Sequence, residues 1–256
     1  MYDQQIILEV SGHSKWANIK RRKGAQDAKR GKIFTKLIKE LTVAAKNGGA
    51  DPEANARLRL AIQNAKGANM PKDNIERAIN KGTGADAEDY IDITYEGYAA
   101  HGVAVFVEAT TDNLNRTVSS VRAAFSKFGG SLGTNGSLEF IFDRKGVFAF
   151  PQPENADLDE LTLDLIDGGA EEVDNEHNYF HVTCNIEDFG NLQRVLDSKF
   201  IEPESADLQR IPNTAVSLND EELGKVFKLI EALEDDDDVQ KVYHNVEIKE
   251  EQMNLV

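Results

Sequence analysis

Apolar residues recur at helical spacing through the first third of the chain. Over residues 32–46 they fall three or four positions apart, so one face of a helix carries them and the opposite face carries lysines. Two more amphipathic helices are predicted at 51–67, with an aspartate as N-cap and a proline in the first turn, and at 71–82. A weaker helical pattern covers 16–29. Helices this short need one another to bury their apolar faces, which predicts a small helical bundle over 12–82.

After residue 84 the pattern changes to short β-rich runs separated by helices. In the run 103–110, for example, valines alternate with other residues, as in a strand. The predicted elements are strands at 91–98 and 103–110, a helix at 115–128, a hairpin of strands 137–142 and 146–151 turning at 143–146, a helix at 157–166, strands at 171–174 and 179–184, a helix at 186–198, strands at 205–211 and 214–218, a helix at 220–233 and a strand at 239–246.

These elements can be grouped into two α+β units. Residues 134–211 come close to a β-α-β-β-α-β order. The other unit would join 91–130 to 213–246, with the first unit inserted between the two parts. Insertion is plausible because a sheet of two or three strands is hard to stabilise alone. The pattern by itself also allows two units in series.

Charge is distributed very unevenly along the chain. Residues 1–85 hold 17 Lys and Arg against 8 Asp and Glu, a net charge of +9, whereas residues 86–256 hold 12 against 37, a net charge of −25; together these give the formal charge of −16. A basic module joined to an acidic body points to a polyanionic partner, because Lys and Arg runs are placed where phosphates lie.

The basic residues concentrate between residues 13 and 39, where ten Lys or Arg side chains occur with one acid, Asp27. A helix can also carry lysines only to solvate its outer face, but here almost no acids balance them. We therefore predict that these side chains contact the phosphates of DNA or RNA. The predicted contacts are Lys15, Lys20, Arg21, Arg22, Lys23, Lys29, Arg30, Lys32, Lys36 and Lys39.

A second candidate contact is the polar loop that joins a strand to a helix at 110–117. Its side chains Asp112, Asn113, Asn115 and Arg116 could reach a ligand, since such loops often carry contacts. The alternative is structural, with Asn113 or Asn115 serving as the N-cap of the helix. Two tyrosines at positions 95 and 98 could stack on bases, although a tyrosine in a sheet is more often buried.

Other chemistry has weak support in the sequence. His13, Ser14 and Lys15 lack a nearby acid and the burial that Ser-Lys catalysis needs, so no catalytic residue is predicted. The run 235–238 consists of four consecutive aspartates without the alternate spacing and glycine of a calcium loop, so it is interpreted as a solvated loop and no metal or cofactor is expected. The single cysteine, Cys184, lies in an apolar run and is predicted to be a buried core residue.

The composition indicates a protein of the cytoplasm. No window approaches 18 consecutive apolar residues, and residues 1–10 have neither the basic nor the apolar region of a signal peptide. One cysteine suits a reducing compartment.

Four segments resemble the YebC/PmpR family. They are GHSKWANIKRRKGAQDAKRGKIFTKLIKEL (12–41), NMPKDNIERAINKGTG (69–84), YEGYAAHGVAVFVEATTDNLNRT (95–117) and GSLGTNGSLEF (130–140). The resemblance spans nearly the whole chain from Gly12, and the long first motif is specific. It implies three domains: a basic helical one (1–84), an acidic α+β one (85–133 plus 212–250) and a ferredoxin-like one (134–211) inserted in the second.

The chain departs from the family pattern in two places. Leu114 stands in the polar loop where the family pattern has Arg, which removes one charge from any contact made there. The family pattern also begins just before the Gly-His-Ser-Lys-Trp motif, so residues 1–11 are expected to be an extension outside the folded core. Val10 could be a GTG start codon decoded as Met, and an intact mass that includes residues 1–9 would refute that hypothesis.

The resemblance implies two functions of different classes. Members have been described as transcriptional regulators, which favours a non-enzymatic DNA-binding regulatory protein. A mitochondrial relative is a translational activator of a cytochrome oxidase subunit, and the family is also described as ribosome-associated factors that assist proline-containing stretches. The alternative is therefore a translation factor that contacts ribosomal RNA or tRNA. A third possibility, small-molecule binding by the ferredoxin-like domains, has no supporting residue cluster.

Overall fold

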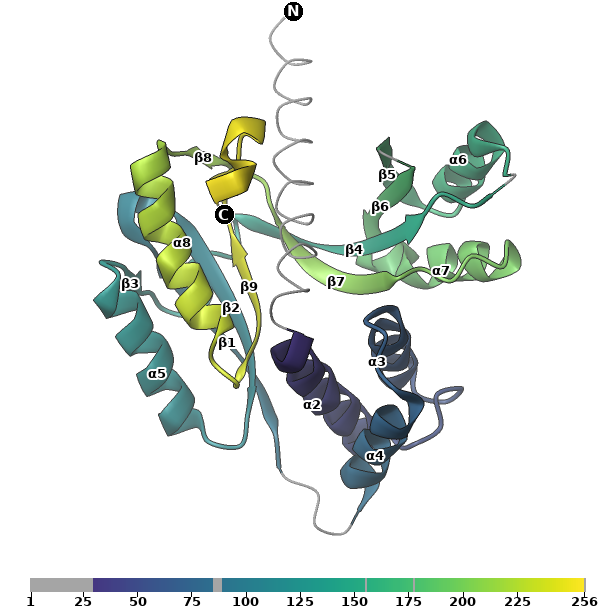
Figure 1. Ribbon diagram of the computed structural model, residues 1–256, viewed down its shortest axis with the longest axis horizontal. Coiled ribbons are helices and arrows are strands. Elements are labelled where there is room, and N and C mark those ends of the chain that lie inside the picture. The colour runs from purple at the N-terminus through teal and green to yellow at the C-terminus, as the bar shows by residue number, and fades with distance from the viewer. Residues whose placement is uncertain (1–29, 85–88, 155, 177, 256) are drawn as a thin grey trace, which may run out of the picture. The chain divides into compact units, whose positions relative to one another are not determined.

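The computed structural model describes residues 30–84, 89–154, 156–176 and 178–255. Their mixed α+β content confirms the predicted fold class (Figure 1). The described residues fall into two compact units. The first consists of the described parts of Met1–Lys36, Glu88–Asp143 and Ile211–Val256, and the second of Leu37–Ala87 and Arg144–Arg210.

Three helices form the helical region, as the periodicity predicts. They are α2 (Arg30–Gly48), α3 (Ala56–Gly67) and α4 (Lys72–Thr83). Their small and apolar side chains are buried against one another, and the hydroxyl of Thr42 on α2 donates a hydrogen bond to the backbone oxygen of Ala78 on α4 at 3.2 Å. The weakly predicted helix at 16–29 lies outside the described residues.

The start of α3 differs from the prediction. Asp51 and the proline after it form a turn, and the helix begins one turn later, with Asn55 as its N-cap. The Asn55 side chain accepts a hydrogen bond from the Leu58 N–H at 3.0 Å and donates to the backbone oxygens of Ala44 and Gly49 at 2.7 and 2.8 Å. One buried amide therefore caps α3 and also ties it to the end of α2.

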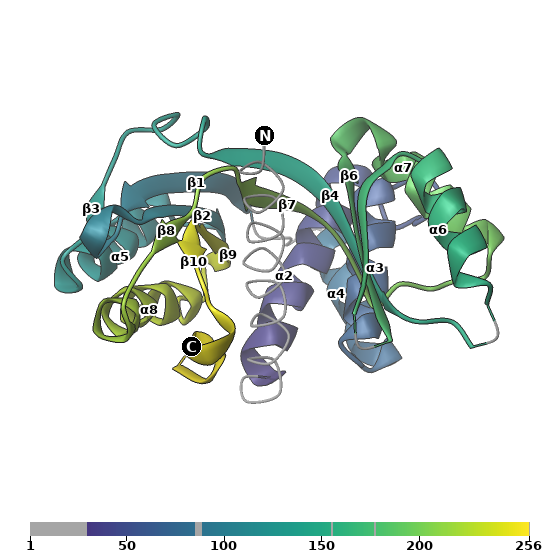
Figure 2. The same cartoon turned by 90° about the horizontal axis from the view of Figure 1, so that it is seen from above.

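The first sheet is antiparallel, with the strand order β3-β1-β2-β9. Its strands are β1 (Ile91–Tyr98), β2 (Ala104–Thr111), β3 (Ser131–Leu132) and β9 (Val239–His244). Two helices, α5 (Leu114–Lys127) and α8 (Asp220–Glu234), cover one face of this sheet (Figures 1 and 2). The remaining elements of this unit are η1 (Ala100–Gly102), the parallel pair β8 (Val216–Ser217) and β10 (Val246–Glu247), and η3 (Glu250–Leu255).

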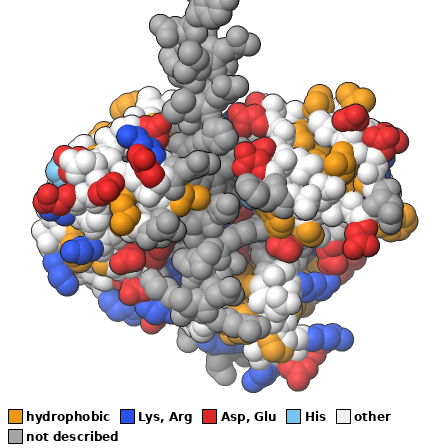
Figure 3. Space-filling model, turned by 45° about the horizontal axis from the view of Figure 1, so that its top comes forward, with side chains coloured by type: hydrophobic (Ala, Val, Ile, Leu, Met, Phe, Trp, Pro, Cys, Tyr) orange, Lys and Arg blue, Asp and Glu red, His pale blue; other side chains and the backbone are white. Residues whose placement is uncertain are grey.

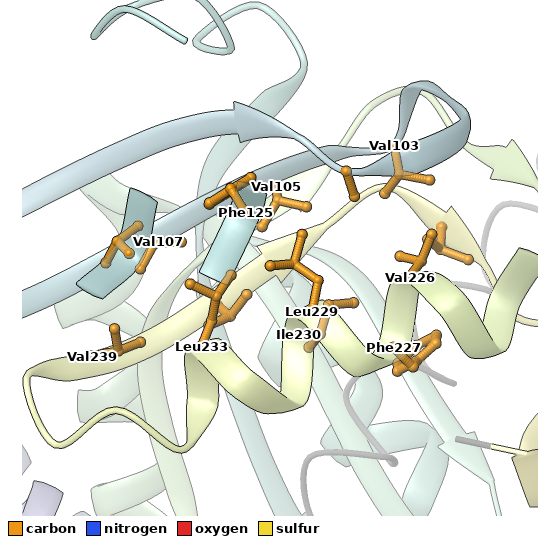
Figure 4. Packing of buried hydrophobic residues seen from close by; sticks show 14 of the residues in the cluster. Val103, Val105, Val107, Phe125, Val226, Phe227, Leu229, Ile230, Leu233 and Val239 are labelled. Atoms are coloured by element: carbon orange, nitrogen blue, oxygen red, sulfur yellow. The ribbon is translucent and has the colours of Figure 1, made fainter. Parts of the chain in front are cut away.

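A hydrophobic core lies between the first sheet and its two helices (Figure 4). Val105 and Val107 on β2 point toward α8, from which Leu229, Ile230 and Leu233 point back. These side chains are almost completely buried. The alternation of valines in β2 thus reflects one face packed against helices, as the period of two in the sequence predicts.

The second sheet has the order β5-β6-β4-β7 and follows the ferredoxin-like β-α-β-β-α-β plan. Its elements are β4 (Phe142–Pro151), α6 (Leu158–Asp167), β5 (Ala170–Glu176), β6 (Tyr179–Asn185), η2 (Ile186–Asp188), α7 (Phe189–Ser198) and β7 (Ser205–Pro212). Because β9 follows this sheet in the chain and pairs with β2, the ferredoxin-like part is inserted into the first sheet's domain rather than following it.

The α3 helix contacts the edge strand of the second sheet. The Asn64 side chain accepts a hydrogen bond from the Ala206 N–H and donates one to the Ala206 backbone oxygen, both at 3.1 Å. The backbone of Glu204 approaches Gly67 so closely that a Cβ atom at that position would overlap its carbonyl oxygen. The start of the edge strand β7 is thereby covered, which hinders pairing with another chain there.

Four predicted strands differ from those in the structure. The hairpin of strands 137–142 and 146–151 is wrong, because residues 137–141 form turns and β4 runs without a break from Phe142, with residues 145 and 146 already paired with β6. The strand at 214–218 shrinks to the two residues of β8, and the last strand is divided at Asn245 into β9 and β10. The domain boundaries given by the family resemblance stay a prediction.

Candidate nucleic-acid interface

The first turns of α2 carry the described part of the predicted basic surface. Arg30 begins the helix, and Lys32, Lys36 and Lys39 follow along it. The other six predicted contacts, Lys15, Lys20, Arg21, Arg22, Lys23 and Lys29, lie outside the described residues. Farther along, α2 buries Leu41 and the alanines after it, so the same amphipathic helix that carries the lysines is held by its apolar face.

Two of these lysines contact the C-terminal end of α8. The Lys32 ammonium lies 2.8 Å from the Asp235 carboxylate, and Lys36 donates a hydrogen bond to the Glu234 backbone oxygen at 2.9 Å. The carbonyls at a helix C-terminus carry partial negative charge and attract cations. Burial nevertheless lowers the pKa of Lys36, and the acidic groups nearby only partly offset this effect. In the structure, therefore, Lys32 and Lys36 tie the first turns of α2 to the C-terminal end of α8; their contact with phosphates stays a prediction.

The polar loop between β2 and α5 is organised around one buried carboxylate, that of Asp238. Its oxygens accept hydrogen bonds from the hydroxyls of Thr111 and Thr117 at 3.2 and 2.8 Å. They also accept a bidentate pair from Arg116, at 2.7 and 2.9 Å from one guanidinium nitrogen and 3.1 Å from another. The solvated-loop interpretation of 235–238 is therefore wrong for Asp238, which faces the interior.

Three of the four candidate contacts in this loop, Asp112, Asn113 and Arg116, have structural roles in the described fold. Asn113 is the N-cap of α5 and accepts from the Arg116 N–H at 3.1 Å. Asp112 pairs with Arg116 at 2.6 Å, and this hydrogen bond lowers the pKa of the Asp112 carboxyl. Hydrogen bonds to Asp238 and Asp112 raise the pKa of the Arg116 guanidinium above its ordinary value. Asn115 and Leu114 are exposed at the start of the helix. A ligand role for these four residues stays a prediction.

The two candidate stacking tyrosines lie in different environments. Tyr95 is buried in the core between the first sheet and its helices, and burial raises the pKa of its phenol. Tyr98, at the end of β1, is exposed. The structure therefore places Tyr95 as a core residue and leaves only Tyr98 accessible to a ligand.

The described residues contain no group of three or more His, Cys, Asp or Glu side chains placed to hold a metal ion. Cys184 is buried, which confirms the predicted core role, and burial raises its pKa to about 11. The triplet His13, Ser14 and Lys15 lies outside the described residues. Acidic side chains are spread over the surface seen in Figure 3, with lysines and arginines between them.

One feature of the site region has no clear signal in the sequence. Glu96 on β1 is buried, and its carboxylate accepts hydrogen bonds from the backbone N–H groups of Gly136 and Leu138 at 2.7 and 2.6 Å. A glutamate in a strand is usually read as solvent-facing. Only the nearby glycine-rich GTNGS segment, which is too polar to fill a core, could have suggested that a carboxylate holds a loop here.

The fold and its charge define a class: an α+β protein with a basic helical N-terminal part and a ferredoxin-like insertion. The N-terminal domain of the TACO1/YebC family matches residues 14–85, and the second and third domains of that family match residues 90–246. The chain belongs to the TACO1/YebC family.

Relatives with high identity match over nearly their whole length. A protein of Amoebophilus asiaticus named "Probable transcriptional regulatory protein" is 62% identical over 239 residues, covering 93% of this chain and 98% of the relative. "Probable transcriptional regulatory protein YrbC" of Bacillus subtilis is 52% identical over 238 residues, covering 92% and 99%.

The solved structure of the conserved hypothetical protein Aq1575 from Aquifex aeolicus has the same fold. It superposes with a TM-score of 0.77 at 45% identity, covering 88% of this chain and 93% of that one. Among the described helices, none is both long enough and apolar enough to span a bilayer.

Proposed function

We propose that this protein is a non-enzymatic, DNA-binding transcriptional regulator of the cytoplasm that contacts phosphates through its basic N-terminal segment. The observation that carries the proposal is the net charge of +9 over residues 1–85 joined to a body of −25. Neutralising phosphates releases condensed counterions, which is a strong and sequence-independent source of affinity. The names of the relatives support the regulatory role.

The contacts outside the described residues carry most of this surface. Lys32 and Lys36 already have partners at the end of α8 in the structure, so the upstream run Lys20, Arg21, Arg22 and Lys23 is the better target for mutation. With about six phosphates neutralised, the logarithm of the association constant should fall against the logarithm of salt concentration with a slope of about −5 on duplex DNA.

The test compares two charge-matched variants of the full-length chain. Replacing Arg21 and Arg22 by Gln should weaken binding to a duplex and make the salt slope shallower by about 2. The control replaces Lys225 and Lys228 by Gln, which removes two exposed positive charges from α8 in the acidic body. A flat salt dependence of the wild-type protein, or equal losses in both variants, would overturn the proposal.

A second candidate is a ribosome-associated translation factor that contacts ribosomal RNA or tRNA. The body's net charge of −25 favours it, since so acidic a body is repelled by a long duplex but complements basic ribosomal proteins. Co-sedimentation with ribosomes, measured beside promoter footprinting, separates the two candidates. Ribosome association without any footprint would support the translation factor and refute the transcriptional regulator.

A further inference from the structure

The segment between β3 and β4 covers the second face of the first sheet, opposite α5 and α8 (Figure 2). Leu138, Ile141 and Phe142 are buried there against Phe106 and Tyr243 from β2 and β9. The rings of Phe106 and Phe142 meet edge to face, with centroids 6.1 Å apart. This segment therefore closes a second, smaller hydrophobic cluster on the sheet.

Hydrogen bonds fix the backbone of this segment on both sides of residue 140. Upstream, Glu96 accepts two hydrogen bonds: its buried carboxylate accepts from the Leu138 N–H at 2.6 Å, and its backbone oxygen accepts from the Gly133 N–H at 2.7 Å. Downstream, the Asn213 side chain donates to the backbone oxygen of Phe140 at 2.8 Å. Residue 140 thus has little freedom to rearrange its backbone.

Phe140 is the one apolar side chain of residues 138–142 that points away from the sheet, with 71% of its surface exposed. Its sequence neighbours on the outer side are polar: Thr134, Asn135 and Glu139 are exposed as well. A rigid backbone that presents a single aromatic ring among polar groups differs from a protein-binding hot spot, in which the anchor is surrounded by other apolar residues. An isolated aromatic ring on a fixed backbone is suited to stacking against the flat face of a base.

We propose that Phe140 stacks on an unpaired base of the nucleic acid that the protein binds. This inference rests on the proposed nucleic-acid binding and adds single-stranded segments as the ligand class. Stacking needs no charge, so it can operate on the acidic body while the basic N-terminal segment supplies attraction to phosphates. Each base stacked on an aromatic side chain raises affinity by about 5- to 150-fold.

Phe200 provides a matched control because it is an equally large exposed ring in a different setting. It follows α7 in a left-handed conformation, with φ of 56°, and 97% of its surface is exposed. It lines a groove together with Ile62, Ile201 and Pro203, so this ring lies among other apolar side chains, whereas Phe140 stands alone among polar groups. Removing this ring changes exposed apolar area without removing a predicted stacking platform.

The experiment measures binding of fluorescent 12-nucleotide single strands and of the corresponding duplex to the full-length protein over a series of salt concentrations. Phe140→Ala should weaken single-strand binding by about 5- to 150-fold, leave duplex binding within about twofold and leave the salt slope unchanged. Phe140→Trp should retain single-strand affinity. Because the side chain is mostly exposed, both variants should keep the wild-type circular dichroism spectrum and melting temperature.

Several results would overturn the inference. Phe140→Ala could bind the single strand as tightly as the wild type, Phe200→Ala could lose as much affinity as Phe140→Ala, or Phe140→Trp could fail to bind. If the wild-type protein binds neither strand form, the proposed function fails and the inference falls with it. If the wild-type protein binds with a steep salt slope but Phe140→Ala loses no more single-strand affinity than Phe200→Ala, the proposed function stands. In that case only the stacking inference is wrong.

Discussion

Neutralising the buried carboxylate of Asp238 should destabilise the first unit. The carboxylate accepts hydrogen bonds from two buried threonine hydroxyls and a bidentate pair from Arg116, and only 8% of the Asp238 side chain is exposed. Asp238→Asn keeps the shape but turns one acceptor into a donor that faces other donors. Arg116 is half exposed and keeps Asp112 as a partner, so the loss falls on the two buried threonine hydroxyls, whose mispaired hydrogen bonds should cost about 1 to 3 kcal/mol of unfolding free energy.

Urea denaturation followed by circular dichroism measures this loss, and hydrogen exchange locates it. Amides of β9 and α5, which meet at the carboxylate, should lose protection before those of the second sheet. Glu231→Gln is the control, because it removes the same charge from an exposed position on α8 and should change stability by no more than about 0.5 kcal/mol. A loss below about 1 kcal/mol for Asp238→Asn, or equal losses for both variants, would refute the assignment of Asp238 as the organiser of the loop.

Three further outcomes follow from described contacts. Asn55→Ala should lower unfolding free energy by about 2 to 3 kcal/mol in urea titrations, since it removes the cap of α3 and two buried hydrogen bonds; a loss under about 0.5 kcal/mol would contradict this role. Gly67→Ala should cost about 1 to 3 kcal/mol through overlap with the Glu204 carbonyl, whereas Gly31→Ala, with open space around its Cβ, should not destabilise. Burial raises the pKa of the Cys184 thiol from 9.0 to about 11, so this thiol should react with a disulfide reagent at pH 8 only after unfolding, and rapid labelling of the native protein would refute its burial. Its contribution to stability should be lost as pH rises from about 9 to 11, because the thiol of the unfolded chain ionises first.

The helices were the part of the fold that the sequence predicted best, for a physical reason. In α4, a proline before the first turn and an apolar face at helical spacing agree with each other, and tertiary contacts had nothing to override. The start of α3 was misplaced because Asp51 and its proline satisfy the local pattern of a helix start, whereas Asn55 gains three hydrogen bonds by capping one turn later. Only the position of α2 in space makes those bonds available.

The strand and site predictions failed where the deciding partner is distant in sequence. Residues 143–146 have turn-forming composition, yet Lys145 and Gly146 pair with Asn185 and Cys184 on β6 and stay extended. The same holds for Arg116, which as an isolated cation in an acidic body resembled a ligand contact. Its partner Asp238 lies 122 positions along the chain. The composition of a loop does not reveal which of its charges are already paired.

The residues at which the chain enters and leaves the ferredoxin-like insertion are joined by a hydrogen bond. The Asn213 N–H donates to the backbone oxygen of Ile141 at 2.9 Å, and the first and last strands of the insertion, β4 and β7, are neighbours in its sheet. Because the chain leaves and re-enters the first domain at one place, the strand order β3-β1-β2-β9 does not depend on the inserted residues. An insertion whose two ends are adjacent can change in length during evolution without changing the strand order of the first sheet.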